Sequence, residues 1–266
     1  MRSVPRPGKL DDMAAHPWNG EGLDGDRTFV HVPAVDTNLV FRTTADRQSD
    51  LIVVGPRTRG SYHPSRPAPV CIRLRLRPGR THRLFGVPVH ELVNRATPIT
   101  HLWGATGRRL QDELAGAEDP AALLVQAVAT RTDGAADEPR RLTAAMRALS
   151  PGAGGNGRLT EVAGRLGISE RHLRTIFARE IGLSPKHFAR IARLRHVLAR
   201  AGSRQWSDLA DDAGFFDQSH LITEFRTLMG VSPAAYLAGR LPAPSPCTDL
   251  TRHPPAVSRA TGARAA

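Results

Sequence analysis

Cysteine is scarce in this sequence, with only Cys71 and Cys247 present. Neither residue belongs to a CxxC motif or to a cluster of cysteine and histidine. A disulfide framework and a cysteine-rich zinc site are therefore not expected. Cys71 stands among apolar residues and is expected to pack in a core, as most free cysteines do. We expect no metal and no other cofactor.

Long apolar runs are also absent. No stretch of about 18 or more apolar residues occurs, so we expect no membrane-spanning helix. The first residues, MRSVPRPGKLDD, lack the apolar segment of a secretory signal. The sequence thus predicts a cytoplasmic protein.

Lysine is nearly missing, with only Lys9 and Lys186, yet the formal net charge is +12 because arginine supplies almost all of the positive charge. This excess favours a polyanionic partner such as nucleic acid. Charge alone does not separate a DNA-binding protein from a basic enzyme. The distinction has to come from the residue pattern.

The first half of the chain has the pattern of a small sheet followed by helices. In residues 71–77 the apolar side chains of Ile72, Leu74 and Leu76 alternate with arginines. This is the period of a half-buried strand. Further β-prone runs are found at 29–32, 38–41 and 50–54. Helical signals follow at 88–95, 105–117 and 120–130. An α+β domain is predicted.

Composition divides the chain into five segments. These are a flexible arm at 1–26, the α+β domain at 27–131, a linker at 132–137, an all-α domain at 138–240, and a disordered tail at 241–266. The arm and the tail are expected to be unstructured because neither has a hydrophobic period.

The all-α segment contains an internal repeat. Residues 169–188 match residues 217–236 at an offset of 48. The matched pairs are His172 and His220, Leu173 and Leu221, Phe177 and Phe225, Gly182 and Gly230, Ser184 and Ser232, and Pro185 and Pro233. Upstream the offset is 47, which places one extra residue in the second copy at Phe215–Phe216. One structural unit therefore occurs twice.

Each copy has the pattern of a helix-turn-helix. In the first copy, apolar residues recur at helical spacing from Leu159 to Leu166, Gly167 allows a tight turn, and Ser169 caps the next helix. Gly214 and Asp217 take these places in the second copy. A linker helix at 185–200, about 24 Å long at 1.5 Å per residue, would set the two recognition helices about one DNA turn apart.

The exposed face of each recognition helix supplies the candidate DNA contacts. Expected base contacts are Arg171, Arg174 and Thr175 in the first unit, and Gln218, Ser219 and Thr223 in the second. Expected contacts to the DNA backbone are Arg179, Lys186 and Arg226, together with His172 and His220, which could instead cap the chain locally. No catalytic residue is expected.

The second copy, GFFDQSHLITEFRTLMGVSPAAY at 214–236, resembles the signature of AraC/XylS-type transcription regulators. The resemblance covers 138–240 and implies a seven-helix domain whose two recognition helices enter adjacent major grooves. The sequence departs from the family at Thr175 and Thr223, where arginine is usual. Threonine cannot form the bidentate guanine contact, so the first unit is expected to read bases better than the second.

Three N-terminal segments resemble a sensing domain that precedes such units: VVGPRTRG (53–60), RLRLRPG (73–79) and LFGVPVHEL (84–92). The sequence departs from it where Pro33-Ala-Val-Asp36 replaces Pro-Asp-Gly. The resemblance implies a sequence-specific transcription regulator, modulated by an unknown small-molecule effector or partner. Its other partners would be double-stranded promoter DNA, RNA polymerase and, as an option, a second copy of the chain.

Two other function classes stay open. An enzyme or metal-sensing protein fused to a DNA-binding unit would need a nucleophile or a ligand set, and no GxSxG or HExxH motif occurs. The histidines at 63, 82, 90 and 101 would have to converge in space. A non-specific architectural protein would bind DNA with a steep salt dependence and without selectivity.

Overall fold

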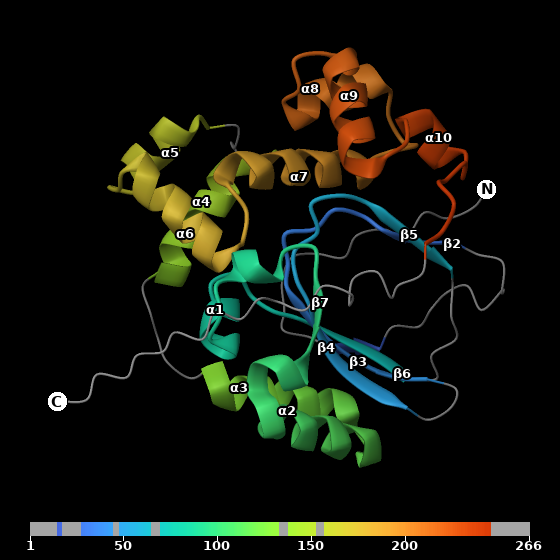
Figure 1. Ribbon diagram of the computed structural model, residues 1–266. Coiled ribbons are helices and arrows are strands. Elements are labelled where there is room, and N and C mark those ends of the chain that lie inside the picture. Colours follow the sequence, from blue (N-terminus) through green and yellow to red (C-terminus); the bar gives the residue numbers. More distant parts are fainter. Residues whose placement is uncertain are drawn as a thin grey trace.

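The computed structural model describes residues 15–17, 28–44, 48–64, 70–132, 138–152 and 157–245. A β-rich N-terminal region over 28–98 is followed by a helical C-terminal region (Figure 1). The predicted order, α+β first and all-α second, is confirmed. No helix in the described part of the chain is long and apolar enough to cross a membrane.

The larger sheet is antiparallel, with strand order β1-β6-β3-β4-β7. Its strands are β1 (Ala15–Pro17), β3 (Asn38–Thr43), β4 (Ser49–Val54), β6 (Val70–Arg75) and β7 (Ala96–Pro98). A separate two-stranded ribbon pairs β2 (Thr28–His31) with β5 (Ser61–Pro64).

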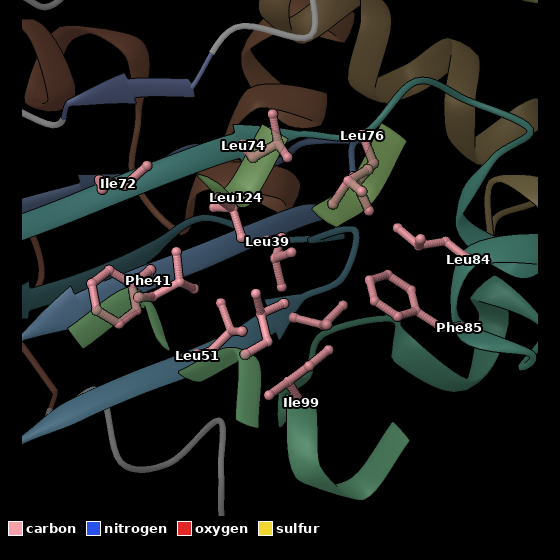
Figure 2. Close-up of a cluster of buried hydrophobic side chains, with 14 of the residues drawn as sticks. Leu39, Phe41, Leu51, Ile72, Leu74, Leu76, Leu84, Phe85, Ile99 and Leu124 are labelled. Atoms are coloured by element: carbon pink, nitrogen blue, oxygen red, sulfur yellow. The ribbon is translucent and has the colours of Figure 1, made fainter. Parts of the chain in front are cut away.

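One face of the larger sheet carries the N-terminal core. Side chains from β3, β4 and β6, among them Leu39 and Leu74, face Phe85 of α1 and Ile99 of α2 (Figure 2). The helices that cover this face are α1 (Thr81–Phe85), α2 (Ile99–Gly116) and α3 (Pro120–Thr132). The alternation predicted for β6 therefore places Ile72 and Leu74 in the core, because successive side chains of a strand point to opposite faces.

The predicted helix at 88–95 is wrong in type and length. The structure has a 3-10 helix, η1 (Val89–Leu92), and the chain leaves helical geometry at Val93. Asn94 adopts a positive φ of 57°, and its side-chain oxygen accepts a hydrogen bond from the backbone N–H of Thr58 at 2.8 Å. This contact across 36 residues favours a turn at Asn94 over a longer helix. The next helix, α2, begins at Ile99, but Gly104 interrupts it with non-helical torsions (φ 57°, ψ −132°), so the helical segment predicted from 105 starts directly after this kink.

The C-terminal region contains α4 (Glu138–Leu149), α5 (Leu159–Arg165), α6 (Glu170–Glu180), α7 (Pro185–Leu198), α8 (Trp206–Ala213), α9 (Gln218–Met229) and α10 (Pro233–Leu237). The first part of α7 contributes Phe188 and Ile191 to the core around α4–α6, and the second part contributes Leu194 and Val197 to the core around α8–α9. One helix thus completes both helix-turn-helix cores.

Two short stretches differ from the predicted arm and tail. Residues 15–17 form β1 and pair with β6. After α10 the chain returns to the N-terminal region, where the N–H of Ser245 donates to the Tyr62 carbonyl at 2.8 Å. Sequence periodicity could not reveal these contacts because both involve distant residues. The rest of the arm and tail, and nearly all of the linker expected at 132–137, lie outside the described residues.

Candidate nucleic-acid interface

The first helix-turn-helix is formed by α5 and α6. Gly167 between the helices has a φ of 66°, a left-handed conformation that glycine adopts without steric cost. Ser169 caps α6, since its side chain accepts a hydrogen bond from the His172 N–H at 3.2 Å. Leu173 and Phe177 point into the core. The opposite face of α6 is therefore left for solvent or a ligand.

That face carries the predicted base contacts of the first unit. Arg171, Arg174 and Thr175 are all exposed. Arg174 is not free, however, because its guanidinium pairs with Glu170 at 2.6 Å. An exposed (i, i+4) ion pair of this kind contributes only about 0.3–0.5 kcal/mol. A DNA base or phosphate could therefore replace Glu170 at little cost.

The second helix-turn-helix is formed by α8 and α9. Gly214 makes the turn with a φ of 73°, Phe215 is buried, and Asp217 caps α9 by accepting the His220 N–H at 2.7 Å. The predicted base contacts Gln218, Ser219 and Thr223 are exposed on α9. The caps, turns and core positions that the repeat predicted therefore occur in both copies.

The predicted contacts to the DNA backbone fall into two groups. His172, Lys186 and Arg226 are exposed and available. Arg179 instead donates to the buried carboxylate of Glu180 at 2.8 Å. The ring of His220 accepts the Phe216 N–H at 3.3 Å and stacks edge-on against Phe215. These last two side chains have local partners, and their predicted DNA contacts stay predictions.

Three charged residues that the sequence analysis did not single out hold the second unit on α7. Arg190 of α7 pairs with Glu224 of α9 at 2.6 Å. Arg193 donates to the Gly214 carbonyl at 3.3 Å and lies over the Phe215 ring. Burial lowers the pKa of Arg193, while the nearby Glu224 favours its charged form. The contact between Arg193 and the turn at Gly214 joins residues that are far apart in the chain, so local sequence patterns do not predict it.

The N-terminal region contacts the first unit at the end of α6. Gly182, just after α6, has a φ of 79°, and a Cβ there would lie 2.7 Å from the side chain of Val93 and 2.8 Å from the Val89 carbonyl oxygen. Only glycine allows the backbones to approach this closely. The loop before β3 also contributes Val35 to the core of this unit.

The N-terminal region contacts the second unit at the opposite end of α7. The hydroxyl of Tyr62 on β5 donates to the Met229 carbonyl at 2.6 Å, and the N–H of Gly60 donates to the Leu228 carbonyl at 2.7 Å. Both carbonyls belong to the last turn of α9. Burial raises the pKa of Tyr62 to about 12, so its hydroxyl remains a donor at neutral pH. The C-terminal end of α9 is thus held by the ribbon.

A third contact joins the N-terminal region to α7. Arg195 donates to the Pro33 carbonyl at 3.4 Å. Burial lowers the pKa of Arg195, and Asp36 opposes this shift. Asp36 is itself buried and pairs with Arg75 of β6 at 2.6 Å. The N-terminal region therefore contacts α7 and the C-terminal ends of both recognition helices, α6 and α9.

The residues considered for a metal site or a nucleophile have other surroundings in the described ranges. No group of three or more histidine, cysteine or acidic side chains within them could hold a metal ion. Burial raises the pKa of the Cys71 thiol, which disfavours the nucleophilic thiolate. His63 is buried and bonded to the Ser61 hydroxyl and the Ser245 carbonyl.

Comparison with known proteins bears on the paired helices. Residues 162–239 match the family model of a helix-turn-helix domain. The paired helices α5–α6 and α8–α9 therefore belong to a helix-turn-helix domain, a type of domain that binds DNA. No curated protein sequence matches the chain.

Three solved structures have some similarity to the chain. The C-terminal domain of AraT, a response regulator from Geobacillus stearothermophilus, has 22% identity and a TM-score of 0.34, covering 40% of this chain and 87% of its own. Apo ToxT from Vibrio cholerae has 13% identity and a TM-score of 0.42, covering 81% and 94%. A second ToxT structure has 12% identity and a TM-score of 0.41, covering 83% and 97%.

Proposed function

We propose that the protein is a sequence-specific transcription regulator that inserts α6 and α9 into adjacent major grooves of promoter DNA. The observation that carries this proposal is the mounting of two helix-turn-helix units on one helix. With 14 residues, α7 is about 21 Å long at 1.5 Å per residue. Recognition helices at its two ends suit successive grooves on one face of the duplex, which lie about 34 Å apart.

The two outward faces support base reading over purely electrostatic binding. Each recognition helix presents a different set of exposed polar side chains, with arginines on α6 and with amide and hydroxyl groups on α9. Such groups read base edges in the major groove. A non-specific architectural protein would need only positive charge. No enzyme activity is proposed.

Selection of binding sites from a random duplex pool tests this function. We expect the purified full-length chain to enrich one sequence that it binds at least about a thousandfold more tightly than unrelated DNA at physiological salt. A chain that enriches no sequence, and whose binding depends only on salt, would be an architectural protein and not a regulator of defined promoters.

We further infer that the N-terminal region modulates DNA binding through its contacts with both units. Tyr62 of the ribbon and Gly60, which directly precedes β5, hold the end of α9, and η1 lies against the end of α6. A ligand or partner that shifts the ribbon relative to α7 would change the position of one recognition helix relative to the other. RNA polymerase contact, a small-molecule effector and homodimerisation stay predictions, as do the domain boundaries at 131 and 138.

Tyr62→Phe tests this coupling, because it removes the hydroxyl that holds Met229 and keeps the ring. We expect about a two- to fivefold loss of affinity for the complete site, in line with about 0.5–1 kcal/mol for one hydrogen bond. A site whose second half is scrambled should bind the variant and the parent equally. Fluorescence anisotropy measures both affinities. A lower melting temperature with unchanged DNA binding would mean that the hydrogen bond between Tyr62 and Met229 only stabilises the fold and does not affect DNA binding.

A further inference from the structure

Phe216 is an aromatic side chain that the fold leaves in solvent. It is 90% exposed, whereas the other exposed large apolar side chains of the described residues, Leu237 and Val70, are 38% and 36% exposed. Exposing a whole phenyl ring to water is unfavourable, because removing apolar surface from water is the main driving force of folding. The side chain of Phe216 is therefore available for a contact outside the packing of the free protein.

The position of Phe216 in the repeat supports this view. In the first copy, Ile168 follows the turn glycine and leads directly to the cap at Ser169. In the second copy, Phe215 takes the core place and Phe216 stands between it and the cap at Asp217. Phe216 is thus the extra residue that the change of offset marks. The core of the second unit is complete without its side chain.

The backbone around Phe216 is well fixed. Its N–H donates to the Nδ1 atom of His220 at 3.3 Å, and the next residue, Asp217, caps α9. The ring of His220 is in turn stacked against Phe215. These contacts hold the residue at the N-terminal end of the recognition helix, beside the exposed Gln218 and Ser219.

We propose that Phe216 is a specificity-determining residue that packs its ring on the C5 methyl group of a thymine in the second half of the DNA site. The proposal rests on the proposed function. Residues at the N-terminal end of a recognition helix are the ones that reach base edges. The thymine methyl is the one apolar group that a base presents in the major groove, and phenylalanine is among the residues that contact it.

This assignment changes the role of the second unit. Its predicted base contacts, Gln218, Ser219 and Thr223, include no arginine, so it lacks the strongest guanine reader. Apolar contact with a methyl group gives the unit a different means of discrimination. The second half-site should therefore contain a thymine preference that depends on Phe216, while the first half-site should depend on the arginines of α6.

Binding-site selection with the full-length parent and with Phe216→Ala locates the base concerned. We expect the variant to lose the preference for thymine at one position of the second half-site and to bind the parent's site about tenfold more weakly. At that position, deoxyuridine in place of thymidine removes only the methyl group. The parent should lose about fourfold in affinity, as expected for one buried carbon group, and the variant should lose nothing.

Val70→Ala is the matched control, since it trims an exposed apolar side chain of β6, away from α9. Three outcomes would overturn the proposal. Phe216→Ala could weaken all sites equally with no coupling to deoxyuridine, which would indicate contact with the sugar. It could leave DNA binding unchanged but abolish transcription with RNA polymerase, which would indicate a protein partner. It could also change neither. If the parent itself selects no site, the proposed function fails instead.

Discussion

Replacing Arg171 and Arg174 together by alanine should lower the affinity for the selected DNA site at least about 30-fold. A good contact between arginine and a base edge is worth about 1–3 kcal/mol, so losing two of them costs about 2–6 kcal/mol, and the lower limit corresponds to the factor of about 30. Both residues lie on the exposed face of α6. Arg174 must leave Glu170 to reach a base, and the weakness of that exposed ion pair makes the exchange inexpensive.

The control for this double variant is Arg108→Ala with Arg109→Ala. These arginines are exposed on α2 in the N-terminal region, and their loss changes the net charge by the same amount. The control should keep the preference for the selected site over unrelated DNA. The variant with alanine at both 171 and 174 should lose that preference. An unchanged ratio of specific to non-specific affinity would remove both arginines from the base-reading set and leave them as phosphate contacts.

The helix-turn-helix pair could be predicted from sequence because its determinants are local. Ser169 and Asp217 cap the helices that follow them, and glycine at 167 and 214 provides the left-handed turns. Each of these features depends on residues within one or two helical turns. The repetition of the pattern at a constant offset then separated it from ordinary helix packing. Local chemistry was sufficient here.

The state of individual side chains was less predictable. Arg174 was expected to be free, yet Glu170 lies one helical turn before it and pairs with it. That partner was visible in the (i, i+4) spacing and could have been found. The engagement of Arg179 by Glu180 depends on the burial of that carboxylate, which only the packed structure reveals.

Contacts between the two regions could not be predicted at all. The Tyr62 hydroxyl and the Met229 carbonyl are separated by 167 residues, and neither local period nor capping rules relate them. The same applies to Ser245, which was assigned to a disordered tail because its surroundings lack hydrophobic periodicity. These contacts matter for function, because they connect the N-terminal region to the recognition helices.

We propose that α7 holds the two recognition helices at a fixed separation. Arg190 and Arg193 bind α7 to the second unit, and buried side chains of α7 complete both cores. A fixed separation requires half-sites that are one DNA turn apart, about 10–10.5 base pairs. Inserting base pairs between them should therefore be costly at every length.

Inserting five base pairs between the two halves of the selected site tests this claim most directly. The insertion turns the second half to the opposite face of the duplex, and affinity should fall at least about 30-fold, to that of a single half-site. Inserting ten base pairs returns the second half to the same face of the duplex but moves it about 34 Å further along the axis. Because α7 cannot span this added distance, the affinity should stay low. Insertions outside the site should have no effect. Recovery at ten base pairs would contradict the account, because it would mean that the two units are flexibly tethered.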